Sequence, residues 1–234
     1  MSFHIIKPIL FNTEMVRAIL ASRKTVTRRV IKPRYRGNEI GFRIDRNMST
    51  GQITGVEIID DEECGTDRYV NPPYQIGDIL YVRETWCRGT DIWNCERTSP
   101  EYFYKAEFRD ASAKDIKWRP SIHMPKEAAR IWLKVTGVHV ERLQDITEDD
   151  VCKEGAEPLI QCAIEHATYN ADGTLGDMCW NTDECSYCPF IEKSYSELFG
   201  KMVWNSTIKK QDLERYGWDA NPWVWVIEFE RIER

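Results

Sequence analysis

The stretch GDILYVRETW, residues 77–86, is the segment that best indicates the fold. A turn at Gly77 leads into a predicted strand, along which successive side chains alternate between two faces. One face holds Ile79, Tyr81, Arg83 and Thr85, and the other holds Leu80, Val82, Glu84 and Trp86. Glu84 is therefore a carboxylate in an otherwise apolar row, and burying it unpaired would cost several kcal/mol. Either a structural ion pair or a functional site must supply its partner.

Other elements follow from hydrophobic periodicity and capping residues. We predict further strands over 101–108, 129–143 and 221–232, and helices over 13–22 (capped by Asn12 or Thr13), 145–156 (capped by Thr147) and 194–208. Residues 37–75 are rich in turn-forming residues, and a hairpin is predicted around 49–51. Because strands outnumber helices, we expect an α+β fold: a mostly β barrel or sheet with peripheral helices. We expect one domain over 1–234, with insertions at about 37–72 and about 157–190.

Composition excludes wholesale disorder and indicates no membrane partner. Of 234 residues, 42% are hydrophobic and 12% are aromatic, which is enough for a core. No apolar run approaches the roughly 20 residues that cross a bilayer, and the first residues lack the pattern of a signal peptide. We therefore expect a soluble, cytoplasmic protein.

The net charge of -6 conceals a basic N-terminal part. Residues 1–46 contain 11 Lys and Arg against 3 Asp and Glu, a balance of +8, so the rest of the chain carries -14. A locally basic end attracts a polyanion at one place. Nucleic-acid binding is one interpretation, and a solvated basic face is the other.

The densest basic segment is SRKTVTRR, residues 22–29, directly after the first predicted helix. A lysine becomes a base only when burial or neighbouring cations lower its pKa. If the chain turns at the helix end, Lys24 can reach the Thr27 hydroxyl and remove its proton. The neighbours that could contact a nucleic acid or nucleoside are Arg23, Thr25, Arg28 and Arg29, although Arg28 could instead face water.

A loop, WRPSIHMPKEAAR at 118–130, combines aromatic, basic and imidazole groups between two prolines that restrain the backbone. Trp118 could stack on a base, and Arg119 and Arg130 could contact anions. Ser121 and His123 are further candidate ligand-binding groups, as is Trp86 at the end of the predicted strand. A lone histidine is nevertheless more often structural than functional.

Eight cysteines are present, and five of them fall between residues 152 and 188. Cys185 and Cys188 have the C-x-x-C spacing that lets two thiolates bind one tetrahedral zinc ion. Cys162 and Cys179 could complete the site, with Cys152 or His166 as substitutes. A structural zinc ion would help a polar insertion to fold, whereas reduced thiols or redox chemistry are the alternatives.

Taken together, SRKTVTRR, GDILYVRETW and the ending NPWVWVIEFERI resemble the ASCH family of the PUA-like superfamily. The loop WRPSIHMP is similar to the phage and prophage branch of that family. The resemblance covers most of the chain outside about 37–70 and 157–190. It implies a PUA-like, mostly β barrel with peripheral helices, whose cleft holds RNA or a modified nucleoside.

The family signature G-x-K-x-x-E-x-R has its four marked positions at Ser22, Lys24, Thr27 and Arg29, so the lysine and the arginine match. The pattern K-T-x-T also resembles small bacterial ASCH amidohydrolases that act on N4-acetylcytidine. That resemblance implies Lys24, Thr27 and Glu84 as the catalytic set, with no cofactor required for catalysis.

Three hypotheses follow from the sequence. The first is an ASCH domain that binds RNA or a modified nucleoside in a basic cleft. The second is an amidohydrolase of N4-acylated cytidine, and the third is a phage structural or partner-binding protein whose cleft is vestigial.

Overall fold

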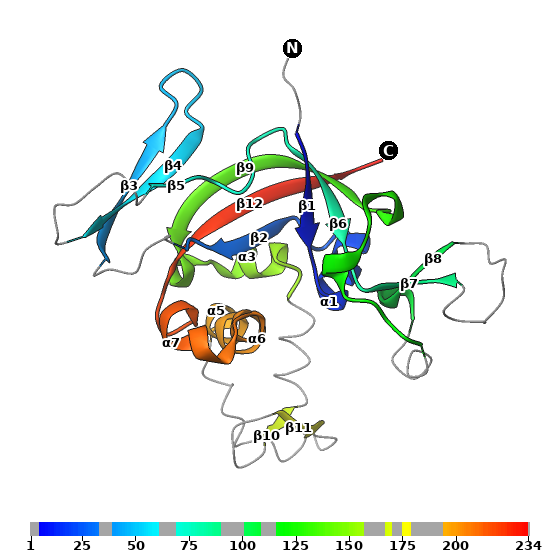
Figure 1. Cartoon of the computed structure of the whole chain (residues 1–234). Coiled ribbons are helices and arrows are strands. Elements are labelled where there is room, and N and C mark those ends of the chain that lie inside the picture. The colour runs from blue at the N-terminus through cyan, green and yellow to red at the C-terminus, as the bar shows by residue number, and fades with distance from the viewer. Residues whose placement is uncertain are drawn as a thin grey trace. The chain divides into compact units, whose positions relative to one another are not determined.

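The computed structural model describes residues 5–32, 39–60, 69–89, 101–108, 116–156, 167–169, 175–178 and 194–233 (Figure 1). Its strands are β1 (Ile6–Leu10), β2 (Val26–Val30), β3 (Glu39–Arg46), β4 (Ile53–Asp60), β5 (Tyr69–Val70), β6 (Ile79–Arg83), β7 (Trp86–Arg88), β8 (Tyr102–Tyr104), β9 (Trp132–Arg142), β10 (Ala167–Tyr169), β11 (Leu175–Met178) and β12 (Trp223–Ile232). Its α-helices are α1 (Thr13–Leu20), α3 (Glu148–Lys153), α5 (Tyr195–Leu198), α6 (Asn205–Thr207) and α7 (Leu213–Tyr216).

Short 3-10 turns and one π-helical segment complete the described structure. The 3-10 turns are η2 (Lys105–Glu107), η4 (Ser121–His123), η5 (Lys126–Ala128), η6 (Leu143–Asp145) and η8 (Lys210–Asp212), and the π-helical segment is η7 (Phe199–Trp204). Sheets with few helices confirm the predicted α+β class.

The chain forms two compact units, each assembled from separate segments. Unit 1 consists of Met1–Thr25, Pro33–His139 and Ile227–Arg234, and unit 2 consists of Val26–Lys32 and Val140–Val226. The long strands β9 and β12 contribute residues to both units.

The largest sheet has five strands in the order β1-β6-β9-β12-β2. Smaller sheets have the orders β3-β4-β5, β7-β8 and β10-β11. Among the described strands, the five-stranded order begins at β1 and ends at β2 without a pairing between them. The closed barrel is thus not observed in this part of the chain and stays a prediction.

In unit 1, β1 and β6 run parallel and side by side (Figure 1), with Ile9 opposite Val82 and Leu10 opposite Arg83. β6 pairs with β9 in the antiparallel sense, with Leu80 opposite Leu133. The inward residues of these strands are fully buried, as expected for the apolar row of the sequence. The predicted strand over 77–86 is shorter than expected, because β6 ends at Arg83 and the pairing resumes only in β7.

Helix α1 covers most of the predicted 13–22 segment and begins where its cap predicts. The Asn12 side chain accepts a hydrogen bond from the Met15 backbone N–H at 2.8 Å. The helix buries Val16, Ala18 and Ile19, which recur at the spacing of one helical face. Asn12 is therefore the cap, rather than Thr13.

The predicted hairpin within 37–75 is present as β3 and β4, joined by the turn from Asn47 to Gln52. Gly51 occupies the left-handed region with φ 69°, which glycine adopts without steric cost. The predicted strand over 101–108 is shorter, because β8 ends at Tyr104 and η2 follows directly.

Unit 2 has a hydrophobic core of its own, which draws on β2, α3, α5, η7 and β12. Its buried residues are Val26, Leu143, Ile146, Val151, Ala156, Leu198, Phe199, Trp204, Trp218, Val224 and Val226. Thr147 caps α3 as predicted and forms a capping box with Asp150. The predicted helix over 194–208 is divided into α5, η7 and α6, with the Gly200 backbone packed against the Trp218 ring.

Candidate functional site

Glu84 lies directly after β6, at the carboxyl end of the parallel pair β1 and β6. One further backbone hydrogen bond joins the two strands at this end: the Phe11 N–H donates to the Arg83 carbonyl at 3.1 Å. Glu84 is 1% exposed, and its own backbone N–H contacts Met124 Sδ at 3.3 Å. The sequence thus predicted its burial correctly, and the break in the strand turns it out of the sheet ladder.

The partner of Glu84 is Arg130, which lies just before β9. Arg130 donates from Nε to Glu84 Oε1 at 2.9 Å and from Nη2 to Oε2 at 3.1 Å. Burial raises the pKa of Glu84 above its usual value, while the hydrogen bonds and the positive charge of Arg130 oppose that rise. The paired geometry keeps a buried carboxylate in one orientation.

Arg130 is itself held from two further sides. Its Nη1 donates to Glu107 of η2, and its guanidinium carbon lies 4.0 Å from the centre of the Tyr104 ring. The Tyr104 hydroxyl donates to the Ala128 carbonyl at 2.6 Å and thereby fixes the segment before Arg130. Burial raises the pKa of Tyr104 to about 12, so this phenol is neutral at physiological pH.

Lys24 follows the C-terminus of α1, where the chain turns sharply, as the sequence predicted. Ser22 adopts the left-handed conformation with φ 57°. The N–H groups of Ser22 and Arg23 donate to the carbonyls of Ile19 and Ala18 at 3.0 and 2.9 Å, which is the Schellman arrangement that glycine usually completes. Ser22 therefore adopts the conformation for which the glycine of the family signature would be suited.

This turn buries the side chain of Lys24, which is 2% exposed. Its Nζ lies 5.6 Å from the centre of the Phe11 ring, and Phe11 is the residue whose backbone bonds to Arg83. Lys24 and Glu84 therefore both adjoin the same end of the β1–β6 pair. Ion pairs join Glu84, Arg130 and Glu107, and Lys24 is grouped with them by its position at Phe11. We call these four residues the charged cluster of unit 1.

The remaining residues of the basic segment divide by burial. Arg23 and Thr25 are exposed and Arg29 is partly exposed. Thr27 is 2% exposed and belongs to β2 in unit 2.

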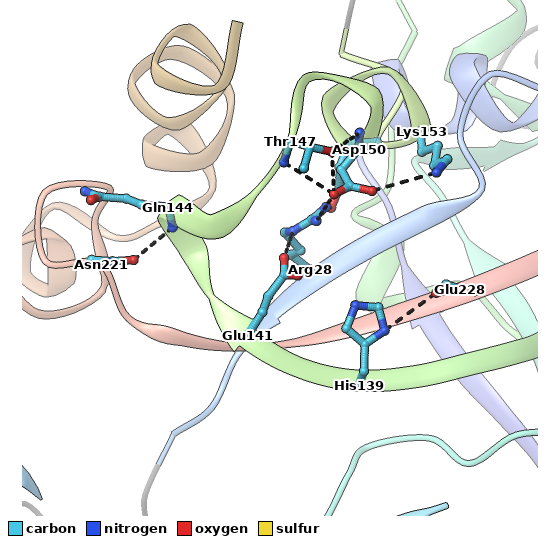
Figure 2. A network of polar contacts seen from close by, with 10 residues as sticks. Arg28, His139, Glu141, Gln144, Thr147, Asp150, Lys153, Asn221 and Glu228 are labelled. Carbon is cyan, nitrogen blue, oxygen red and sulfur yellow. Dashed lines mark hydrogen bonds and ion pairs between the residues drawn. The ribbon is translucent and has the colours of Figure 1, made fainter. Parts of the chain in front are cut away.

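Arg28 does not face water, and its environment does not suit a contact with nucleic acid (Figure 2). Its side chain is 1% exposed. It donates to Glu141 at 2.7 Å, as Figure 2 shows, and to Glu154 at 3.3 Å. Asp150 completes the group at 3.4 Å. The expectation that Arg28 faces water is therefore wrong. A guanidinium surrounded by three carboxylates has little capacity left for a phosphate, so the structure gives no support to its predicted ligand contact.

Asp150 joins this ion cluster to the start of α3. Burial alone would raise the pKa of Asp150, but hydrogen bonds from the Thr147 hydroxyl and backbone N–H, together with the charges of Arg28 and Lys153, lower it overall. The carboxylate thus serves both the helix cap and the buried arginine, which indicates a structural role.

The two tryptophans predicted to bind a ligand, Trp86 and Trp118, differ in their exposure to solvent. Trp86 is 3% exposed, packs on Tyr102 with ring centres 5.7 Å apart, and exchanges backbone hydrogen bonds with Arg119. Its predicted role as a ligand-binding group is therefore not supported, because the ring is part of the core. Trp118 is partly exposed and meets Phe108 edge to face at 5.4 Å.

The rest of the predicted binding loop is surface structure. Ser121 and His123 form η4; the serine is partly exposed and the histidine is exposed. The Arg119 guanidinium lies 5.4 Å from the Trp86 ring centre. The loop thus offers polar groups of unit 1 to solvent, as expected of a binding loop.

The predicted zinc ligands Cys162, Cys179, Cys185 and Cys188 lie outside the described residues. Within the described part of the chain, no group of three or more His, Cys, Asp or Glu side chains could hold a metal ion. The zinc site stays a prediction.

Sequence reasoning missed the roles of Glu107 and Tyr104, and it considered Arg130 only as an anion contact. The need of Glu84 for a partner was evident in the apolar row of the strand. The identity of that partner was not, because Arg130 is 46 residues away and reaches Glu84 only through the fold.

The described helices include none that is both long and apolar enough to span a bilayer. No family model, curated protein or solved structure matches this chain. The ASCH resemblance accordingly stays a hypothesis carried by the motifs of the sequence.

Proposed function

We propose that the chain binds RNA or a modified nucleoside through unit 1, with the charged cluster of Lys24, Glu84, Arg130 and Glu107 as the recognition centre. The observation that carries this proposal is the burial of Lys24 and Glu84 at the same end of the β1–β6 pair. The PUA-like barrel and its cleft belong to the same proposal and rest on the resemblance.

Burial of these two groups supports a function because it is costly. Lysine and glutamate are almost never fully buried unless they are paired, and a replacement by apolar residues of similar volume is often neutral or stabilising. Ionisable groups kept in such places cluster at functional sites. A carboxylate and an ammonium also match the donor and acceptor edges of a nucleobase.

The surroundings supply the contacts that a polynucleotide needs. Arg23 is exposed beside Lys24 and could contact a phosphate, whereas Trp118 offers a partly exposed ring for stacking. His123 and Ser121 lie on the same loop as Trp118. These groups combine charge with an aromatic surface, which is how single-stranded RNA is bound.

The test is a thermal-shift and tryptophan-fluorescence titration at low salt. Single-stranded RNA of about ten nucleotides, cytidine and N4-acetylcytidine serve as separate probes. We expect at least one probe to raise the melting temperature, because a ligand that binds only the folded state stabilises it. Arg43→Gln is the matched control, since Arg43 is an exposed arginine paired with Glu57. If no probe changes either signal, the binding function is wrong.

A second candidate is the amidohydrolase of N4-acylated cytidine. The observation that favours it is that each residue of the implied set is buried: Lys24 and Thr27 are 2% exposed and Glu84 is 1% exposed. Hydrolysis would transfer the acyl group from the N4 amine of the base to water, and the resemblance implies Lys24 as the general base.

The discriminating experiment is incubation of N4-acetylcytidine with the wild type, Lys24→Ala and Thr27→Val. Chromatography should show release of cytidine by the wild type alone. Binding without turnover would leave the nucleoside-binding function as the better description. Turnover that persists in folded Lys24→Ala would show that this lysine is not the base.

A further inference from the structure

The Glu84 carboxylate keeps hydrogen-bonding capacity beyond its pair with Arg130. An ionised carboxylate has about four lone-pair sites, and the fork of Arg130 occupies one on each oxygen. The hydrogen bonds described for this carboxylate come from Arg130, and Glu84 is only 1% exposed. Buried acceptor sites that meet no donor are costly, so a donor from a ligand at these sites would be favourable.

Arg130, in contrast, has few hydrogen-bond donors left, because most of them already bind a carboxylate. Nε and Nη2 bind Glu84, Nη1 binds Glu107, and Tyr104 covers a face of the guanidinium. Such a guanidinium has few donors left for a phosphate. It acts instead on the carboxylate that it holds.

We propose that Arg130 is a positioning residue for Glu84, which it holds as a hydrogen-bond acceptor for the N–H groups of an uncharged nucleobase edge. This inference rests on the proposed function and specifies it. The ligand group recognised at this point donates hydrogen bonds and is not an anion, because Glu84 offers acceptor atoms and the Arg130 donors already bind Glu84 and Glu107.

The neighbouring charges act on Glu84 in opposite directions, which makes the role measurable. Burial raises the pKa of Glu84, Arg130 lowers it, and the charge of Glu107 raises it. Removal of Arg130 leaves burial unopposed and favours the protonated carboxyl, which has lost acceptor capacity. Removal of the Glu107 charge should favour the ionised form.

The first experiment follows the side-chain carboxyl carbon of Glu84 by NMR in the 13C-labelled full chain, with Glu84→Gln to identify the signal. In Arg130→Gln we expect the titration midpoint to move to higher pH, and in Glu107→Gln to lower pH. Arg130→Lys retains the charge but loses the fork, so its midpoint should lie between those of the wild type and Arg130→Gln. The exposed Arg43→Gln should leave the midpoint unchanged.

The second experiment measures affinity for the single-stranded RNA and N4-acetylcytidine probes as a function of pH. We expect Arg130→Gln to bind about tenfold more weakly or worse at the low end of the pH series, where Glu84 is protonated and charge-assisted hydrogen bonding is lost. Its affinity should recover as the pH is raised and Glu84 ionises. A variant that was merely misfolded would show no such recovery.

The outcomes separate the two proposals. An unchanged Glu84 titration in folded Arg130→Gln would overturn the role of Arg130, even if the wild type binds RNA. Absence of binding by the wild type would overturn the proposed function and the ligand assignment, whereas the NMR titrations would still decide whether Arg130 controls Glu84. If Arg130→Gln does not fold, Arg130→Lys and Glu107→Gln provide the same test. The Glu84 titration midpoint should move up in the first variant and down in the second. Midpoints that do not move, or that move in the same direction, would contradict the role of Arg130.

Discussion

Arg130 donates one hydrogen bond to each carboxylate oxygen of Glu84, from Nε at 2.9 Å and from Nη2 at 3.1 Å, although the two residues are 46 positions apart in the sequence. This pair joins the end of β6 to the start of β9 and is buried on the Glu84 side. A carboxylate enclosed in this way links the stability of the protein to pH.

Glu84→Gln should reveal that linkage. Burial raises the folded-state pKa of Glu84 above its usual 4.5, against the opposing effect of Arg130. A raised pKa means that the folded state binds the proton more tightly than the unfolded state. This contribution is fully present below pH 4.5 and is lost as the pH rises through the folded-state pKa. The stability of the wild type relative to Glu84→Gln should therefore fall as pH increases across that range.

Urea unfolding at a series of pH values measures this difference. Arg43→Gln provides the control, since the loss of this exposed pair leaves Glu84 and its charged neighbours in place. A stability difference that does not vary with pH would contradict the linkage.

Ser22→Gly should stabilise the protein. Ser22 has φ 57° at the end of α1, and a left-handed conformation costs a residue with Cβ roughly 1–2 kcal/mol. Glycine removes that cost but gains entropy in the unfolded chain, so we expect a net gain of up to about 1 kcal/mol. Chemical denaturation at neutral pH measures it. Ser22→Ala keeps Cβ and should give no gain; equal stabilisation by both variants would exclude this explanation.

Arg28→Gln should destabilise unit 2. The substitution leaves Glu141, Asp150 and Glu154 without the guanidinium that they share, and breaking a buried ion pair costs about 3–5 kcal/mol. Partial exposure of Glu141 and Asp150 places the expected loss toward the lower end. Arg43→Gln, at an exposed pair, should cost less than about 1 kcal/mol.

Calorimetry and urea unfolding of the two arginine variants provide the measurement. A similar, small loss in both would show that the Arg28 cluster contributes little to stability. Where Arg28→Gln remains folded, its affinity for RNA should equal that of the wild type, because Arg28 is not a ligand contact.

Gly200→Ala should disrupt the core of unit 2. A Cβ at this position would overlap the ring of Trp218, and overpacking a core typically costs about 1–3 kcal/mol. The near-ultraviolet circular dichroism of the protein and its melting temperature should both change. Lys201→Ala, which removes an exposed ion pair with Glu197, is the neighbouring control; equal effects would argue against packing as the cause.

Metal analysis should find about one zinc ion per chain if the four predicted cysteines form a tetrahedral site. Treatment with a chelator should then lower the melting temperature, because metal binding contributes to folding. Cys185→Ser should lose the metal, whereas Cys87→Ser should retain it, since Cys87 lies in β7. Metal-free protein purified under reducing conditions would rule out the zinc prediction.

Local features were well determined by the sequence. Asn12 and Thr147 cap the helices that they were predicted to cap, because a side-chain oxygen satisfies backbone N–H groups a few residues away. The alternating pattern around Glu84 correctly predicted which row is buried, because a strand exposes successive side chains to opposite faces. The end of α1 before Lys24 was likewise evident.

The partners of the charged residues were decided only by the tertiary structure. Glu84 and Arg28 both had to be paired or exposed, but their partners lie 46 residues away in one case and 113 to 126 residues away in the other. Periodicity describes neighbours within one element, whereas an ion pair depends on how separate elements pack. The sequence thus determined that Glu84 would be buried and that Lys24 would follow a helix end. Only the fold decided that Arg130 holds the first and that Phe11 lies beside the second, because long-range packing brings those groups together.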